Sequence, residues 1–130
     1  MTALRKLAAR LRANRDGAST VEFALVAPLV IMVIIGGMYL SMLGFTASSL
    51  HYSAQAAARC RSVNTTICTD AATTQTFAGN QFMNLAGNTA TFTASTAACG
   101  NRVIGTVTFA LNAGMSKMNI PLSASACFPS

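Results

Sequence analysis

The feature that most constrains this chain is one long apolar run near its amino terminus, Phe23–Phe45. No charged side chain follows Glu22 until Arg59. As a helix, these 23 residues would measure roughly 34 Å, enough to cross a hydrocarbon core of about 30 Å. The sequence therefore predicts a transmembrane helix, which we place at residues 18–45.

Glu22 is the single carboxylate at the edge of this run, five residues after Gly17. A carboxylate in an apolar zone costs roughly a few kcal/mol unless it finds a partner, so it is a functional candidate. Cleavage between Gly17 and Ala18 would create a free amine as that partner. The order of basic leader, glycine, glutamate and long apolar helix resembles the class III signal of type IV pilin-like proteins. The alternative is a plain signal anchor, in which Glu22 has no role.

The net charge of +6 comes mainly from the leader, because five of the nine basic residues lie among the first fifteen. Positive residues that flank a membrane helix stay in the cytoplasm. We therefore interpret residues 1–17 as a cytoplasmic leader that is cleaved, with the rest of the chain beyond the membrane helix facing outward. The mature chain would keep a charge of only +2, which argues against a nucleic-acid partner. Its charged residues would be Arg59, Arg61, Arg102 and Lys117 against Glu22 and Asp70.

All four cysteines fall in the predicted outward part, and an even number in a small domain is typical of disulfides in an oxidising compartment. Zinc binding is disfavoured because there is no C-x-x-C pair and the only histidine, His51, has no second ligand near it in sequence. We expect no metal and no cofactor. Three pairings are possible, and we favour the one that ties the end of each predicted element to its neighbour. That pairing joins Cys60 to Cys68 and Cys99 to Cys127.

The first predicted element is the long helix, which continues past the membrane as a stalk over residues 46–62 because alanine and leucine repeat at helical spacing. Pro28 lacks a backbone donor and is expected to kink the helix near its inner end. Ala54-Gln55-Ala56 also resembles the cleavage site of a secretory signal, and cleavage there remains an alternative. His51 and Tyr52 are expected to be an exposed polar pair on the stalk.

Residues 63–130 are predicted to form an extracytoplasmic α+β domain tied by disulfides, with one helix and a short antiparallel sheet. The helix is expected at 70–86, with Thr69 as its N-cap and Gly87 as its stop. Alternation and turn residues place strands at 89–95, 102–111 and 118–127, separated by turns at 99–101 and 112–114. The predicted buried residues of the helix are Ala72, Phe77, Gln81 or Phe82, and Leu85.

The stretch R-D-G-A-S-T-V-E-F-A-L-V-A-P-L-V-I-M-V-I-I-G, followed by S-L-H-Y-S-A-Q-A-A-A-R, is similar to the TadE-like family, pilin-like proteins of the tight-adherence (Flp) pilus machinery. The similarity covers about residues 15–60. It implies that a prepilin peptidase cuts between Gly17 and Ala18 and that Glu22 serves in assembly. The chain departs from the family where members often carry an acidic residue in the outer half of the helix or charges on the stalk. These departures are Tyr39, His51, Tyr52 and Gln55.

The resemblance implies a structural role as a minor pilin or pseudopilin in assembly of a tight-adherence (type IVc/Flp) pilus used in surface adhesion. The implied partners are the prepilin peptidase, other pilin-like subunits and the assembly platform of the bacterial inner membrane. Two alternatives remain, a pseudopilin of a type II-like secretion system and a single-span anchor for an extracytoplasmic binding module. An enzyme is not expected, because the outer domain offers one aspartate and no histidine after His51.

Overall fold

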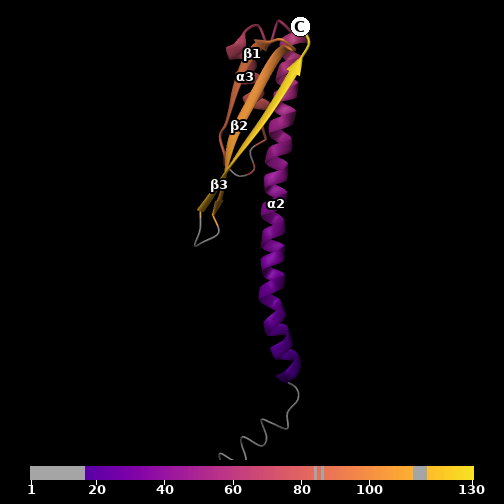
Figure 1. The fold of residues 1–130 in the computed structure, drawn as a ribbon, viewed down its shortest axis with the longest axis vertical. Coiled ribbons are helices and arrows are strands. Elements are labelled where there is room, and N and C mark those ends of the chain that lie inside the picture. The colour runs from indigo at the N-terminus through magenta and orange to yellow at the C-terminus, as the bar shows by residue number, and fades with distance from the viewer. Residues whose placement is uncertain (1–16, 84, 86, 113–116) are drawn as a thin grey trace, which may run out of the picture. The chain divides into compact units, whose positions relative to one another are not determined.

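The structure, a computed structural model, describes residues 17–83, 85, 87–112 and 117–130. These ranges form two helices and three strands (Figure 1). The predicted leader, apart from Gly17, and the predicted turn residues 113 and 114 lie outside them. The predicted α+β class is confirmed. The elements are α2 (Ala18–Val63), α3 (Ala71–Gln81), β1 (Ala90–Ala97), β2 (Gly100–Asn112) and β3 (Lys117–Phe128).

The chain divides into two compact units, and the boundary falls within α2 after Met38. In the first unit the structure describes Gly17 and the part of α2 that ends at Met38, whose large apolar side chains are exposed. Pro28 lies inside α2, which is helical on both sides of it. The kink expected at Pro28 stays a prediction.

The second unit, Tyr39–Ser130, is built around an antiparallel sheet with the strand order β1-β2-β3. Each strand alternates between a polar outer face and an apolar inner face, as a sheet with one solvated face requires. The inner face shares one core with α2 and α3. This core consists of Leu50, Ala54, Ala57 and Ala58 from α2, Ala78 from α3, and Phe92, Val103, Val107 and Ala124 from the sheet.

Gly105 permits the closest contact between the sheet and α2. A Cβ atom at this position would lie 2.6 Å from Cε1 of Phe92 and 2.9 Å from Cδ1 of Leu50. Phe92 is the cross-strand partner of Gly105, so its ring covers the place where a side chain would stand. The missing side chain therefore lets β1 and α2 meet over β2.

The helix α3 is shorter than predicted, and its N-cap is Asp70 instead of Thr69. The Asp70 carboxylate accepts the backbone N–H of Thr73 at 2.8 Å, and the Thr73 hydroxyl accepts the backbone N–H of Asp70 at 3.1 Å. This reciprocal capping box satisfies two backbone donors and starts the helix at Ala71.

The far end of α3 is also different, because the helix stops at Gln81 and Gly87 does not act as its C-cap. Phe82 adopts an extended backbone, and its ring meets that of Phe92 edge-on with centroids 6.3 Å apart. The next residue, Met83, donates its backbone N–H to the Ser49 hydroxyl of α2 at 2.9 Å. Packing against other elements therefore ends the helix before its sequence does.

The buried face of α3 was only partly predicted. Phe77 and Phe82 pack against the core as expected, but Ala72 and Leu85 are exposed. The fully buried positions are instead Thr74 and Ala78, one turn apart. Thr74 is tolerated there because its hydroxyl donates to the Asp70 carbonyl at 2.6 Å.

The predicted strands match the observed ones to within one or two residues, but the turn predicted at 99–101 is tighter than expected. The chain reverses at Ala98 and Cys99, and β2 already begins at Gly100. Gly100 has a φ of +116°, and a Cβ atom there would collide with the carbonyl oxygen of Phe128. Only glycine suits a backbone with this φ so close to a neighbouring chain.

Candidate processing and assembly site

The predicted cleavage position coincides with the start of a helix. The helix α2 begins at Ala18, so the Gly17–Ala18 peptide bond lies at its amino-terminal boundary. Gly17 is exposed, and a Cβ atom there would have nothing within 4 Å. The first N–H groups of a helix have no partner within it, so this end is easier to unwind than its middle. Within the described residues, nothing shields this bond from a peptidase.

Glu22 is exposed and lies four residues after Ala18, one helical turn further along α2. Residues at this spacing are neighbours on a helix surface, with Cβ atoms about 5–6 Å apart. Helical side chains also lean toward the amino terminus, which directs the carboxylate of Glu22 toward Ala18. An amino group released at Ala18 would therefore have a carboxylate one turn away. The arrangement can form an ion pair, within one chain or with a neighbouring copy.

The surroundings of Glu22 are apolar and uncovered. The adjacent residues Val21 and Phe23 are exposed at 62% and 72%. Ser19–Val63 is long and apolar enough to cross a membrane, with a mean hydropathy of 2.4 in its most apolar window. A helix with apolar side chains exposed on all its faces fits lipid better than water. The apolar helix therefore suggests single-pass membrane anchoring.

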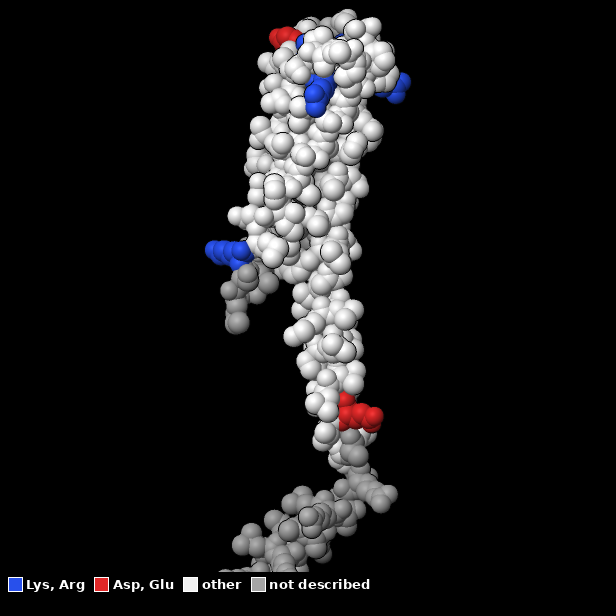
Figure 2. All heavy atoms as spheres, in the orientation of Figure 1, with Lys and Arg blue, Asp and Glu red and all other residues white. Residues whose placement is uncertain are grey.

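Charge is scarce over the visible surface between these two ends (Figure 2). Among the described residues, the only acidic side chains are Glu22 and Asp70. Two hydrogen bonds from Thr73, one from its backbone N–H and one from its hydroxyl, hold the pKa of Asp70 below its ordinary value.

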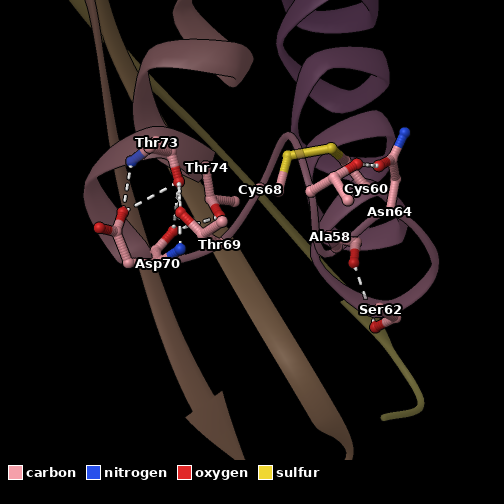
Figure 3. Close-up of a disulfide and its surroundings, with 10 residues drawn as sticks. Ala58, Cys60, Ser62, Asn64, Cys68, Thr69, Asp70, Thr73 and Thr74 are labelled. Atoms are coloured by element: carbon pink, nitrogen blue, oxygen red, sulfur yellow. Dashed lines mark hydrogen bonds between the residues drawn. A yellow bond between two sulfur atoms is a disulfide. The ribbon is translucent and has the colours of Figure 1, made fainter.

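Both disulfides form in the favoured pairing. Cys60–Cys68 joins the last turns of α2 to the loop before α3, next to the Asp70 cap (Figure 3). Cys99–Cys127 joins the β1–β2 turn to the end of β3. The cysteines therefore hold the elements of the outer domain together at the end where α2 stops.

A groove of about 610 Å³ lies beside these disulfides. Its lining holds a single cation, Arg59, and no aspartate, glutamate or histidine. The groove therefore offers apolar contact and one positive charge, and its lining has no general base. The apolar and aromatic part of the lining includes Tyr52, Val63, Ile67, Phe77, Ala126 and Phe128.

The other residues singled out in the sequence lie apart from this site. His51 and Tyr52 are exposed on α2, as expected for a polar pair. Ala54-Gln55-Ala56 lies inside α2, and Ala54 is completely buried in the core, so a peptidase could not reach this segment without opening the domain. No cluster of three potential metal ligands occurs within the described ranges.

Sequence reasoning missed the polar contacts that fasten α2 to the outer domain. Asn101 Nδ2 donates to the Ser62 hydroxyl at 2.9 Å, and Ser49 accepts the N–H of Met83. Asn101 is only 9% exposed. A serine within an alanine-rich helix does not by itself indicate a distant partner, so no local signal could have identified these pairs.

Comparison with known proteins agrees with the sequence resemblance. The family model described as TadE-like protein matches residues 17–59, which include Gly17, Glu22 and Pro28. No curated protein and no solved structure matched the chain. Over residues 17–59, about a third of its length, the chain is therefore a TadE-like protein, as the sequence resemblance indicated.

Proposed function

We propose that this protein is a minor pilin or pseudopilin, a structural subunit for assembly of a tight-adherence pilus. The observation that carries the proposal is the TadE-like match, which covers the predicted cleavage position and Glu22. The start of α2 at Ala18 and the position of Glu22 one turn later support the same function. The partners would be a prepilin peptidase, other pilin-like subunits and the assembly platform of the inner membrane.

The proposed topology places the amino terminus in the cytoplasm and the domain from residue 63 onward in the periplasm of a bacterial cell. The basic residues before Gly17 support this orientation through the positive-inside rule. Both disulfides lie in the outward part, where an oxidising compartment would maintain them. Incorporation into a fibre at the cell surface, for adhesion, belongs to the same proposal.

The role we propose is structural and not catalytic. Its support is chemical, because the groove beside the disulfides combines apolar side chains with Arg59 and has no base in its lining. Such a surface suits contact with another protein better than turnover of a substrate.

The test is the intact mass of the protein purified from membranes of its own host. We expect a chain that begins at Ala18, because the Gly17–Ala18 bond is exposed at the helix boundary and a carboxylate lies one turn from the new amine. A second purification from a strain without its prepilin peptidase is the control, and there the leader should remain.

Two other outcomes would overturn the proposal. A chain that begins at Met1 in both strains would indicate a single-span anchor for a binding module. A chain that begins near Ser53 would indicate secretion after cleavage at Ala54-Gln55-Ala56 or close to it.

A further inference from the structure

The strands β2 and β3 continue beyond the end of β1 as a two-stranded ribbon. The pairing of β1 with β2 ends at Ala90 and Val107, whereas β2 and β3 stay paired as far as Asn112 and Lys117. The described residues of this ribbon are therefore 108–112 and 117–121, which we call the terminal ribbon. Its inward side carries apolar residues in every pair: Phe109 opposite Ile120 and Leu111 opposite Met118.

Two contacts fix the direction of the terminal ribbon relative to α2. Asn101 is hydrogen-bonded to Ser62, and Gly105 lies against Leu50. The chain of β2 therefore runs toward the amino-terminal end of α2 as its residue numbers rise, and Figure 1 shows this course.

The length of the terminal ribbon brings its end close to the apolar run of α2. From Gly105 to Asn112, seven residues of strand add about 23 Å, which equals about 15 residues of helix. The ribbon therefore passes along α2 from Leu50 back to about Tyr39, within one compact unit. Burial agrees with this course, since Phe109 is 2% exposed and Thr46 of α2 is 4% exposed.

The expected outer edge of the bilayer falls at the same level. A hydrocarbon core of about 30 Å needs about 20 helical residues. Counted from Phe23, the first residue after Glu22, that length ends at Met42. We propose that the end of the terminal ribbon rests on the lipid headgroups of the outer leaflet, so that the outer domain contacts the membrane at a second place besides α2.

The side chains at this end fit the boundary between headgroups and acyl chains. Met118 is exposed at 59%, and its neighbour Lys117 is exposed and is the only charged residue of β3. A lysine can bury its aliphatic stem among apolar groups and hold its ammonium at the level of the lipid phosphates. The open edges of a two-stranded ribbon need water, so the contact is shallow and does not enter the hydrocarbon core.

The chain contains no tryptophan, so a single introduced tryptophan reports its own depth. Met118→Trp in the full chain would be placed in vesicles of phosphatidylcholine and phosphatidylglycerol whose acyl chains carry bromine near the headgroup. We expect its fluorescence to fall relative to unbrominated vesicles. Met32→Trp, in the apolar run of α2, should respond to deeply placed bromine and confirms insertion. Thr93→Trp, on the outer face of β1, should not respond.

A second reporter keeps the test independent of any one variant. Asn119→Trp, also exposed at this end, should show the same loss of fluorescence. Adding Lys117→Glu to the Met118→Trp chain should reduce the loss in vesicles with phosphatidylglycerol and leave it unchanged in phosphatidylcholine alone.

The proposal is overturned if Met118→Trp and Asn119→Trp keep their fluorescence while Met32→Trp is quenched. Equal quenching of Thr93→Trp would also overturn it, because the domain would then lie on the membrane without preference for the terminal ribbon. The experiment requires membrane anchoring alone, so its result does not depend on whether the protein serves in a pilus.

Discussion

At the scale of single residues, Gly105 shows why a small residue is required at the centre of the sheet. The space a side chain would occupy is filled by the ring of Phe92 and the side chain of Leu50. A protein interior is packed as densely as an organic crystal, so an added methyl group must displace one of these neighbours. The glycine thereby sets how closely α2 approaches β2.

We expect Gly105→Ala to destabilise the outer domain by about 1–3 kcal/mol, because it overpacks the contact with Phe92 and Leu50. The measurement is urea unfolding in detergent, followed by circular dichroism. Gly79→Ala is the matched control, since nothing lies within 4 Å of a Cβ atom there. In the helix α3 that change should stabilise by up to about 1 kcal/mol. Equal unfolding midpoints for the two variants would contradict this view of the core.

At the scale of elements, the two disulfides fasten different parts of the outer domain. Cys60–Cys68 spans 8 positions in sequence and closes the loop after α2. Cys99–Cys127 spans 28 positions and holds the three strands at one end. On the chain-entropy model, loops of these lengths correspond to about 2.5 and 3.5 kcal/mol of stabilisation. The longer bridge should therefore matter more.

We predict that Cys99→Ala lowers the stability of the domain by about 3.5 kcal/mol and releases a single thiol, that of Cys127. Because Cys127 is exposed, a maleimide should label it in the folded protein. Cys60→Ala is the comparison, since it releases Cys68, which is 1% exposed and should be labelled mainly after unfolding. Labelling of Cys60 or Cys68 in the Cys99→Ala chain would show a different pairing.

At the scale of the whole molecule, the distribution of charge is as informative as the fold. Residues 62–130 carry only Asp70, Arg102 and Lys117 as charged side chains, whereas about a quarter of residues are charged in ordinary soluble domains. The exposed face of the sheet is instead covered with threonine and serine. Such a surface suits a domain that is tethered and packed beside other subunits.

The proposed assembly role makes Glu22 the most informative position in the chain. We expect Glu22→Ala to insert normally, because it removes a charge from an apolar helix, and to assemble poorly, because the amine of Ala18 loses its partner. The number of pili should fall by about tenfold for each 1.4 kcal/mol of lost pairing energy. Counting pili by electron microscopy and the subunit in membranes by immunoblot separates the two effects.

Thr20→Ala is the matched control for Glu22→Ala, because Thr20 is also an exposed polar residue near the start of α2. It should leave both insertion and piliation unchanged. Normal piliation in the Glu22→Ala strain would remove the proposed role of this carboxylate.

The sequence alone determined the features that depend on neighbouring residues. The uncharged run Phe23–Phe45 predicted a membrane helix, and alternation of apolar and polar residues predicted all three strands. The favoured cysteine pairing followed from the ends of those predicted elements. These features are local, because hydropathy, turn residues and backbone preference act over a few positions along the chain.

The tertiary structure decided what depends on contacts between distant residues. The helix α3 ends at Gln81 because Phe82 turns toward Phe92 and Met83 bonds to Ser49. Helical periodicity could show that α3 has an apolar side, but only the neighbouring core determined that Thr74 and Ala78 are buried. The level that the terminal ribbon reaches along α2 follows in the same way from the Gly105–Leu50 contact. A sequence pattern specifies an element, whereas its end and its buried face depend on what packs against it.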